Sequence, residues 1–291
     1  MRGACIDIGS NTTRLLVADC EDGHLRAVQQ SRAFTGIGRA ISSEGMISAP
    51  KVAEVGEVVA AQLEQARSLG AEQISCVATA SVRRAVNQEV LVRWIERRCP
   101  SLTVRVLSAE EEARLAFLGA SRTLSDPPKG LLGLIDVGGG SSEIVVGDPL
   151  TGVSWWASLP IGSGELSAEL VHSDPPSPAE LAQVRARVQA ALDGLQPPRP
   201  ALAVAVGGSA SSLLQMTGGV LDAEALARAL QLVTARPAAA VAIDTGLDLE
   251  RVQLLPAGLV ILEEARQRFD QPLLVGSGGL REGVLLEAAA E

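Results

Sequence analysis

The stretch Leu131 to Gly147, LLGLIDVGGGSSEIVVG, decides the fold of this chain. An apolar run precedes Asp136, three consecutive glycines follow shortly after it, and a second apolar run follows Glu143. This order predicts a β-hairpin whose tight glycine turn carries a carboxylate at each shoulder. Glycines leave the backbone N–H groups uncovered, so such a turn can bind an anion. The flanking carboxylates suit a hard cation such as Mg²⁺ that lies between them and phosphate oxygens.

The same pattern occurs at the beginning of the chain. Residues 6–17, IDIGSNTTRLLV, align without a gap with residues 135–146, IDVGGGSSEIVV. A single Asp-x-Gly turn is usually a solvent-exposed hairpin, whereas two copies in the same register indicate an internal duplication. We therefore expect two related lobes.

Composition limits the function classes. The 291 residues are enough for two domains, each with its own core, and 47% hydrophobic but only 2% aromatic residues predict an aliphatic interior. The net charge of −9 argues against a nucleic-acid or membrane partner, although a local arginine cluster can still hold a polyanionic substrate. The four cysteines lack metal spacing and predict reduced thiols in a cytoplasmic protein. We also expect no signal peptide and no membrane span.

Alternating strand and helix patterns predict an α/β fold with a mixed sheet flanked by helices in each half. In the first half we expect strands over 24–30, 73–77 and 103–107, a loop over 34–38, and helices over 48–70, 87–100 and 108–121. In the second half we expect strands over 153–159, 201–206 and 273–275, and a closing helix from 280. The linker-like TLSDPPK at 123–129 predicts lobes of 1–125 and 126–291, with the last helix free to pack on the first lobe.

Two of these helices carry finer predictions. Ser48 is expected to cap the helix over 48–70, whose buried face would contain Val52, Val55, Val59, Leu63 and Ala66. The inward face of the next helix is expected to contain Val90, Leu91, Trp94 and Ile95. Its arginines Arg93, Arg97 and Arg98 could follow a long polyanion or simply face solvent.

The glycine turns supply the candidate ligand groups, because ligands of such sheets bind beyond the carboxyl ends of the strands. The phosphate-binding candidates are Gly9, Ser10, Asn11 and Thr12 in the first turn and Gly138, Gly139, Gly140 and Ser141 in the second. Asp136 and Glu143 would hold Mg²⁺ directly or through water, although Asp136 could instead accept hydrogen bonds within its turn. Gly207, Gly208 and Ser209 open a helix that could take a phosphate, and tight packing explains the same glycines equally well.

Four segments together resemble the exopolyphosphatase and guanosine pentaphosphate phosphatase (Ppx/GppA) family of the actin, sugar kinase and Hsp70 superfamily. They are Ala4 to Val17 (ACIDIGSNTTRLLV), Ser108 to Phe117 (SAEEEARLAF), Leu134 to Gly147 (LIDVGGGSSEIVVG) and Gly278 to Gly283 (GGLREG). The resemblance spans essentially the whole chain and fits the short form of the family. It implies two duplicated ribonuclease H-like, actin-like lobes with a cleft between them. The implied activity is Mg²⁺-dependent release of terminal phosphate from inorganic polyphosphate or guanosine pentaphosphate.

The resemblance also implies residue roles. It places the general base on Glu111, at the start of the helix after the fifth strand, although Ser108 and Glu111 also fit a purely structural capping box. Glu110 or Glu112 is the base if the register shifts by one. Arg83 matches a family arginine that reaches the reacting phosphate, and Arg14 would contact a ligand or pair with a nearby acid.

Two departures from the family pattern reduce the expected number of cations around the cleft. Phe34 to Gly38 stands where the family often has an arginine, and Glu165 stands where it often has another. These departures affect the expected substrate preference and the binding of long polyphosphate, and they leave the hydrolytic core unchanged. Two rival functions stay open: an ATP-dependent kinase or ATPase of the same superfamily, and a non-catalytic sensor of an alarmone or polyphosphate. A homodimer is also left open.

Other chemistries lack support in the sequence. The sequence contains no G-x-x-x-x-G-K-[ST] and no G-x-G-x-x-G, which argues against a P-loop or a dinucleotide site. Its two histidines, His24 and His172, lie outside every motif, which argues against a Ser-His-Asp triad.

Overall fold

The computed structural model of the protein describes residues 1–41 and 43–290. The chain divides into two compact units: unit 1 comprises Met1–Thr123 and Leu280–Glu291, and unit 2 comprises Leu124–Gly279. The last helix, α12 (Leu280–Ala288), therefore lies in unit 1, where it packs on α5 (Ala109–Arg122) and β1 (Arg2–Ile8). Within the described residues, no helix combines the length and apolar character needed to cross a bilayer.

Unit 1 is built on a five-stranded mixed sheet with the order β3-β2-β1-β4-β5. β1, β2 (Thr12–Glu21) and β3 (His24–Phe34) form an antiparallel meander. β4 (Gln73–Ala78) and β5 (Val104–Val106) extend the sheet in parallel on the other side of β1. The carboxyl ends of β1, β4 and β5 therefore meet at one edge of the sheet, next to the turn after Ile8.

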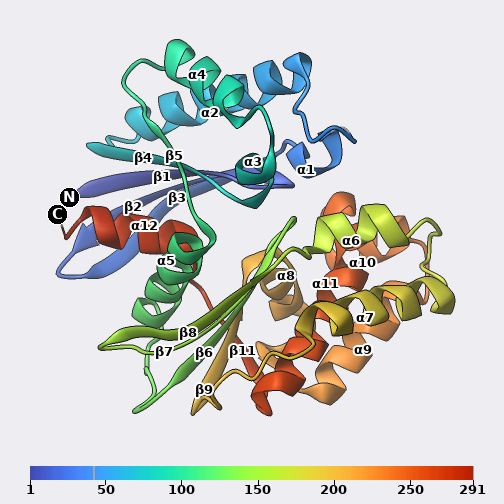
Figure 1. The fold of residues 1–291 in the computed structure, drawn as a ribbon. Coiled ribbons are helices and arrows are strands. Elements are labelled where there is room, and N and C mark those ends of the chain that lie inside the picture. Colours follow the sequence, from blue (N-terminus) through green and yellow to red (C-terminus); the bar gives the residue numbers. More distant parts are fainter. Residues whose placement is uncertain (42, 291) are drawn as a thin grey trace. The chain divides into compact units, whose positions relative to one another are not determined.

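Helices cover both faces of this sheet (Figure 1). Alternate side chains of β1 point to opposite faces, so Ala4, Ile6 and Ile8 pack toward α2 (Ala49–Ser68) and α4 (Gln88–Arg98). Cys5 faces the other way and packs with residues of α5 and α12. Two short helices, α1 (Ile37–Ala40) and α3 (Ala80–Arg84), follow β3 and β4.

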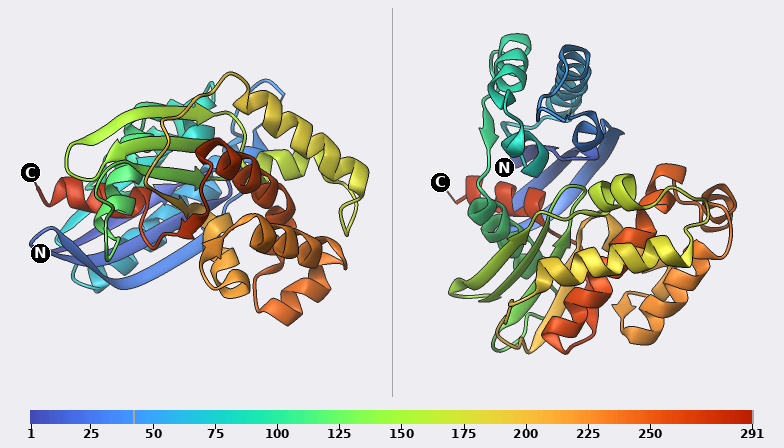
Figure 2. Two further views of the ribbon diagram at one scale, coloured as in Figure 1. Left: turned by 90° about the horizontal axis from the view of Figure 1, so that it is seen from below. Right: turned by 45° about the vertical axis from the view of Figure 1, so that its right-hand side comes forward.

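The helices α2 and α4 run side by side (Figure 2). They approach closely at Gly56, where an added Cβ would lie only 1.8 Å from the Trp94 ring. The predicted face of α2 is confirmed, since all five of its apolar residues are buried.

Unit 2 repeats the same strand order. Its sheet runs β10-β11-β9-β6-β7-β8, formed by β6 (Leu132–Val137), β7 (Ser142–Asp148), β8 (Gly152–Leu159), β9 (Leu202–Val206), β10 (Val220–Leu221) and β11 (Leu273–Val275). Without the two-residue β10, the order β8-β7-β6-β9-β11 matches β3-β2-β1-β4-β5 strand for strand, including which pairs are parallel. The predicted duplication and the mixed α/β fold of each half are confirmed.

Six helices accompany the second sheet: α6 (Ser163–Leu170), α7 (Pro178–Leu192), α8 (Gly207–Thr217), α9 (Ala223–Thr234), α10 (Ala238–Thr245) and α11 (Leu249–Phe269). The 21-residue α11 is the central helix of the unit, since most of its residues are buried and it contacts α6, α7, α8 and α9. Figure 1 shows it passing behind α6 and α7.

Several local predictions were wrong. β3 extends to Phe34, and α1 begins at Ile37, inside the predicted loop. Ser48 occupies the N-cap of α2, but its side chain makes no capping hydrogen bond to any described residue. Val90 is 51% exposed, because the buried face of α4 follows Leu91 and Ile95 at a spacing of four.

Candidate functional site

The two glycine turns have the same internal construction. In each turn, the first glycine donates its N–H to a carbonyl three residues later: Gly9 to Thr12 at 3.1 Å, and Gly138 to Ser141 at 3.0 Å. A Cβ at these glycines would lie 3.0 and 2.9 Å from the same carbonyl oxygens, so a side chain would crowd the turn. The N–H groups of Gly9 and Gly138 thus donate inside the turns, whereas their predicted part in phosphate binding stays a prediction.

In unit 1, the short helix after β3 anchors the turn. Gly38 donates its N–H to the Ser10 carbonyl at 2.9 Å, and Gly36 donates to the Asn11 carbonyl at 3.0 Å. Because N–H and C=O point in opposite directions across a planar trans peptide, the N–H of Asn11 points away from this helix. The buried Ser81 hydroxyl also donates to Ser10 Oγ at 2.6 Å, which fixes the Ser10 side chain.

Unit 2 repeats this arrangement with α6. Ser163 and Gly164 donate their N–H groups to the carbonyls of Gly138 at 2.9 Å and Gly139 at 3.0 Å. A Cβ at Gly162 would lie 2.3 Å from the Gly139 carbonyl carbon, so α6 approaches the turn closely. The same peptide geometry directs the N–H groups of Gly139 and Gly140 away from α6, where an anion can reach them.

The carboxylates of the second hairpin face each other across it. Asp136 and Glu143 are direct partners in the β6–β7 ladder, so their side chains lie on the same face of the sheet. Glu143 is 2% exposed, and Ser158 donates its hydroxyl to Glu143 Oε1 at 2.9 Å. A Cβ at Gly207 would lie 2.6 Å from Asp136 Oδ1, so this carboxylate rests against the first residue of α8.

This donor set fits Mg²⁺. Among the described residues, no cluster of three or more His, Cys, Asp or Glu side chains could enclose a metal ion. Mg²⁺ does not need such a cluster, because it commonly binds one or two carboxylates and takes its other ligands from water and substrate phosphates. Two carboxylates on one face beside a turn with outward N–H groups provide that kind of partial site.

Tight contacts explain the glycines at the start of α8. Gly207 adopts φ +89°, and its missing side chain leaves room for Asp136. A Cβ at Gly208 would lie 2.2 Å from Arg251 Nη1, so the guanidinium of this 5% exposed arginine packs directly on the helix start. The Ser209 side chain lies against Gly258 of α11, and its Oγ has no hydrogen-bond partner in the described part of the chain. Gly207, Gly208 and Ser209 thus have a packing explanation, and their predicted phosphate contact stays a prediction.

The sequence prediction missed Arg251. Its position has a signal in the sequence, because Arg251, Leu255, Gly258 and Leu262 follow one another at spacings of three and four and are all buried on α11. Because Arg251 is in phase with this apolar stripe, it is buried with it. Its guanidinium lies beside Gly208, one of the predicted phosphate-binding residues.

The three glutamates at the start of α5 have different environments. Glu111 accepts a hydrogen bond from the Ser108 N–H at 2.8 Å, and the Ser108 hydroxyl accepts one from the Glu111 N–H at 3.1 Å. This capping box lowers the pKa of Glu111, chiefly through the hydrogen bond from the Ser108 backbone. Glu112 is buried, and Arg83 Nη1 donates to Glu112 Oε2 at 2.8 Å and to the Leu107 carbonyl at 2.7 Å.

These contacts bear on the choice of base. The capping box uses the Glu111 carboxylate to accept the Ser108 N–H, which supports a structural role for this residue. Glu112 lies beside Arg83, the arginine expected at the reacting phosphate. Burial also distinguishes the two residues, because Glu112 is buried and Glu111 is only half-buried.

The remaining predicted residues lie as follows. Arg14 lies opposite Asp7 in the β1–β2 ladder and donates to Thr12 Oγ1 at 3.0 Å. Glu165 is exposed in the first turn of α6. Two of the three predicted α4 arginines form ion pairs with nearby acids, Arg93 with Glu89 and Arg98 with Glu57.

Asp7 is the counterpart of Asp136 in the first hairpin. Its Oδ1 is buried and has no hydrogen-bond partner among the described residues. Burial raises the pKa of Asp7, and the nearby guanidinium groups of Arg14 and Arg281 oppose that rise.

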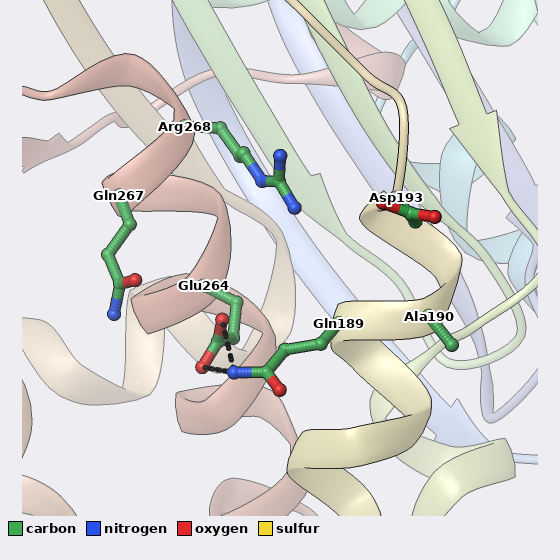
Figure 3. Close-up of a pocket in the computed structure, with 6 residues that line it drawn as sticks. All are labelled: Gln189, Ala190, Asp193, Glu264, Gln267 and Arg268. Atoms are coloured by element: carbon green, nitrogen blue, oxygen red, sulfur yellow. Dashed lines mark hydrogen bonds between the residues drawn. The ribbon is translucent and has the colours of Figure 1, made fainter.

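A hollow of about 670 Å³ lies on unit 2, away from these residues, between α7 and α11. Figure 3 shows Gln189 of α7 donating to both carboxylate oxygens of Glu264 of α11, at 3.2 Å each. Arg185 pairs with the same carboxylate at 2.6 Å, so these polar groups join the two helices. None of the predicted site residues lines the hollow.

Comparison with known proteins gives consistent matches. The model of the Ppx/GppA phosphatase family matches residues 16–291. Exopolyphosphatase 1 of Mycobacterium tuberculosis is 28% identical over 98% of this chain and 88% of that protein. Exopolyphosphatase 2 of the same organism is 30% identical over 86% of this chain and 78% of that protein. The crystal structure of the Aquifex aeolicus member of the Ppx/GppA family is 27% identical, with a TM-score of 0.83, over 100% of this chain and 98% of that chain.

Proposed function

The chain belongs to the Ppx/GppA phosphatase family and is a hydrolase of phosphoanhydride bonds, and on that premise we propose which substrate it takes and which residues act. The proposed reaction is release of the terminal phosphate of inorganic polyphosphate, and of the 5′-terminal phosphate of guanosine pentaphosphate, with Mg²⁺. The observation that carries the proposal is the repeated hairpin, because each unit presents a turn whose backbone N–H groups face away from its anchoring helix.

Phosphate oxygens would bind to the N–H of Asn11 in unit 1 and to the N–H groups of Gly139 and Gly140 in unit 2. Asp136 and Glu143 would hold Mg²⁺, which when bound screens the charge of the phosphate chain. Ser158 supports this role by fixing the Glu143 carboxylate. Gly207 supports it by leaving room for Asp136 at the start of α8.

We assign the general base to Glu112, one of the two alternatives to Glu111 that the register leaves open. Its carboxylate would accept a proton from the attacking water, while the shortened polyphosphate chain departs from the opposite side of the terminal phosphorus. Arg83 would hold Glu112 in place and offer its remaining N–H groups to the transferred phosphoryl group. Glu111 would serve as the helix cap that sets the beginning of α5.

The test compares Glu112→Gln with Glu111→Gln. Phosphate release is measured from polyphosphate, guanosine pentaphosphate and ATP in the presence of Mg²⁺, and folding is checked by the melting temperature. We expect Glu112→Gln to lower kcat by about 10² to 10⁴, because glutamine cannot accept the proton. Glu111→Gln should retain most activity, because glutamine can still close the capping box.

The reverse ranking of the two variants would return the base to Glu111. Wild type that releases phosphate fastest from ATP would indicate an ATPase rather than an exopolyphosphatase. Wild type that binds polyphosphate and releases no phosphate from any of the three would refute the catalytic proposal in favour of a sensor.

A further inference from the structure

A five-residue helix, α3, lies between the first glycine turn and the start of α5. The turn, α3 and α5 follow β1, β4 and β5, which are parallel neighbours, so the three segments line up along one edge of the unit 1 sheet. Neighbouring strands are about 4.8 Å apart, which places the turn about 10 Å from the start of α5. The helix α3 therefore occupies the middle of a row that begins at the predicted phosphate-binding turn and ends at the proposed base, Glu112.

On one side, α3 contacts the turn through a buried pair of hydroxyls. Ser81 is 1% exposed, and its hydroxyl donates to Ser10 Oγ at 2.6 Å. A Cβ at Gly38 would lie 3.1 Å from Ser81 Oγ and 3.5 Å from Ser10 Cβ, so this glycine leaves room for the pair. Because Ser10 Oγ accepts the hydrogen bond, its own proton is available for another acceptor. None of the described residues accepts that proton.

On the other side, α3 holds the proposed base. Arg83 donates through Nη1 to Glu112 Oε2 at 2.8 Å and to the Leu107 carbonyl at 2.7 Å. Residues two positions apart on a helix point about 200° apart, so Ser81 and Arg83 reach in opposite directions, toward β1 and toward α5. A helix this short has little stability of its own, so contacts such as these fix its position.

We propose that Ser81 is a positioning residue, which through α3 couples the first glycine turn to the Arg83–Glu112 pair. This proposal rests on the hydrolase function proposed above. The hydrogen bond from Ser81 leaves the Ser10 proton for a phosphate oxygen held at the turn, and it fixes the helix that carries Arg83. The reacting phosphorus and the Glu112 carboxylate then keep a constant separation, as in-line attack by water requires.

The test compares wild type with Ser81→Ala, Ser10→Ala and the double variant, and uses Ser31→Ala as the matched control. Ser31 also belongs to unit 1, and its hydroxyl donates to Gln65 Oε1 at 2.8 Å, a hydrogen bond that involves no residue of α3. kcat and KM are measured for polyphosphate with Mg²⁺, and melting temperatures check folding. Loss of a purely structural hydrogen bond lowers the melting temperature, whereas loss of a positioning one also lowers kcat of the folded protein.

We expect Ser81→Ala to lower kcat about tenfold, because a slightly misplaced catalytic group costs up to about 10²-fold. KM should change by less than about twofold, because the backbone N–H groups of the turn still bind phosphate. The double variant should have the kcat of Ser10→Ala alone, since the two hydroxyls act through one hydrogen bond. Ser31→Ala should keep the wild-type kcat.

The NMR signals of the Arg83 guanidinium give a readout that needs no turnover. They are assigned by their absence from the spectrum of Arg83→Lys. In wild type and in Ser31→Ala, the hydrogen bonds to Glu112 and Leu107 should protect the Arg83 N–H groups from exchange with water. Both Ser81→Ala and Ser10→Ala should weaken that protection, because each removes one partner of the same hydrogen bond.

A wild-type kcat in folded Ser81→Ala would overturn the proposal, as would unchanged exchange of the Arg83 N–H groups. Additive losses of kcat in the double variant would show that Ser81 does not act through Ser10, and an equal loss in Ser31→Ala would show a general effect of packing; either result refutes the coupling. Absence of phosphate release by wild type would refute the proposed function alone, since the exchange measurement still decides whether Ser81 positions Arg83.

Discussion

Gly207→Ala should damage unit 2 at the point where Asp136 meets α8. The new methyl group would lie 2.6 Å from Asp136 Oδ1 and 2.6 Å from the Val137 carbonyl oxygen. The backbone there has φ +89°, a conformation that costs an alanine about 1–2 kcal/mol. Overpacking against β6 adds about 1–3 kcal/mol, because the carbonyl is backbone and cannot turn aside.

Gly246→Ala separates the two contributions. Gly246 also belongs to unit 2 and adopts φ +69° after α10, but an added Cβ would meet no described atom within 4 Å. It should therefore lose only the conformational part, about 1–2 kcal/mol. The expected loss for Gly207→Ala is about 2–5 kcal/mol, and the difference between the variants measures the crowding at Asp136.

Urea unfolding followed by circular dichroism gives both free energies. Phosphate release against Mg²⁺ concentration gives the second readout, because a displaced Asp136 should require more Mg²⁺ for half-maximal activity. Gly246→Ala should retain the wild-type Mg²⁺ dependence. Equal destabilisation of the two variants together with an unchanged Mg²⁺ dependence of Gly207→Ala would refute the reasoning.

Two further predictions concern pH. Burial raises the pKa of Asp7 above 3.8, so the folded state binds the proton more tightly than the unfolded state. Wild type should therefore gain stability relative to Asp7→Asn as pH falls from neutral toward 3.8. Urea titrations of both proteins at several pH values measure this, and a constant difference in their free energies of unfolding would contradict it. The capping box lowers the pKa of Glu111 below 4.5, so its stabilisation is present above pH 4.5 and is lost as pH falls through the folded pKa. Ser108→Ala should raise that pKa toward 4.5 in a carboxyl NMR titration and cost about 1 kcal/mol for the lost cap, and an unmoved pKa would show that the hydroxyl has no part in it.

The alignment of residues 6–17 with 135–146 was enough to predict two related lobes, because a repeated strand-turn-strand pattern is readable in a single sequence. The actin-like fold of the lobes followed from the family resemblance. The strands that follow each hairpin were also predictable from their apolar runs. The helices α9 and α10 were not placed individually, although α9 carries a readable pattern, since its buried Ala225, Leu226, Ala229 and Val233 recur at helical spacing. The start of α1 was missed for another reason: two of its four residues lie in a glycine-containing segment that local pattern assigns to a loop.

The candidate site was less predictable, because much of it depends on contacts between distant segments. The sequence predicted two anion-binding turns, but only the structure shows that the N–H groups of Gly9 and Gly138 donate hydrogen bonds inside them. The choice between Glu111 and Glu112 depends on whether Arg83, 29 residues away, reaches one or the other.

The duplication also suggests how the two hairpins came to differ. Each has an aspartate at the end of its first strand, and the partner opposite that aspartate is Arg14 in unit 1 but Glu143 in unit 2. In unit 1 the pair is electrically balanced, so the arginine can turn toward an anionic ligand without leaving the turn strongly negative. In unit 2 two carboxylates share one face, and in the proposed function a divalent cation would relieve their repulsion while phosphates complete its ligand shell. We therefore expect the exchange of arginine for glutamate at one ladder position to favour a metal in unit 2 alone, while the backbone N–H groups of both turns remain candidates for phosphate.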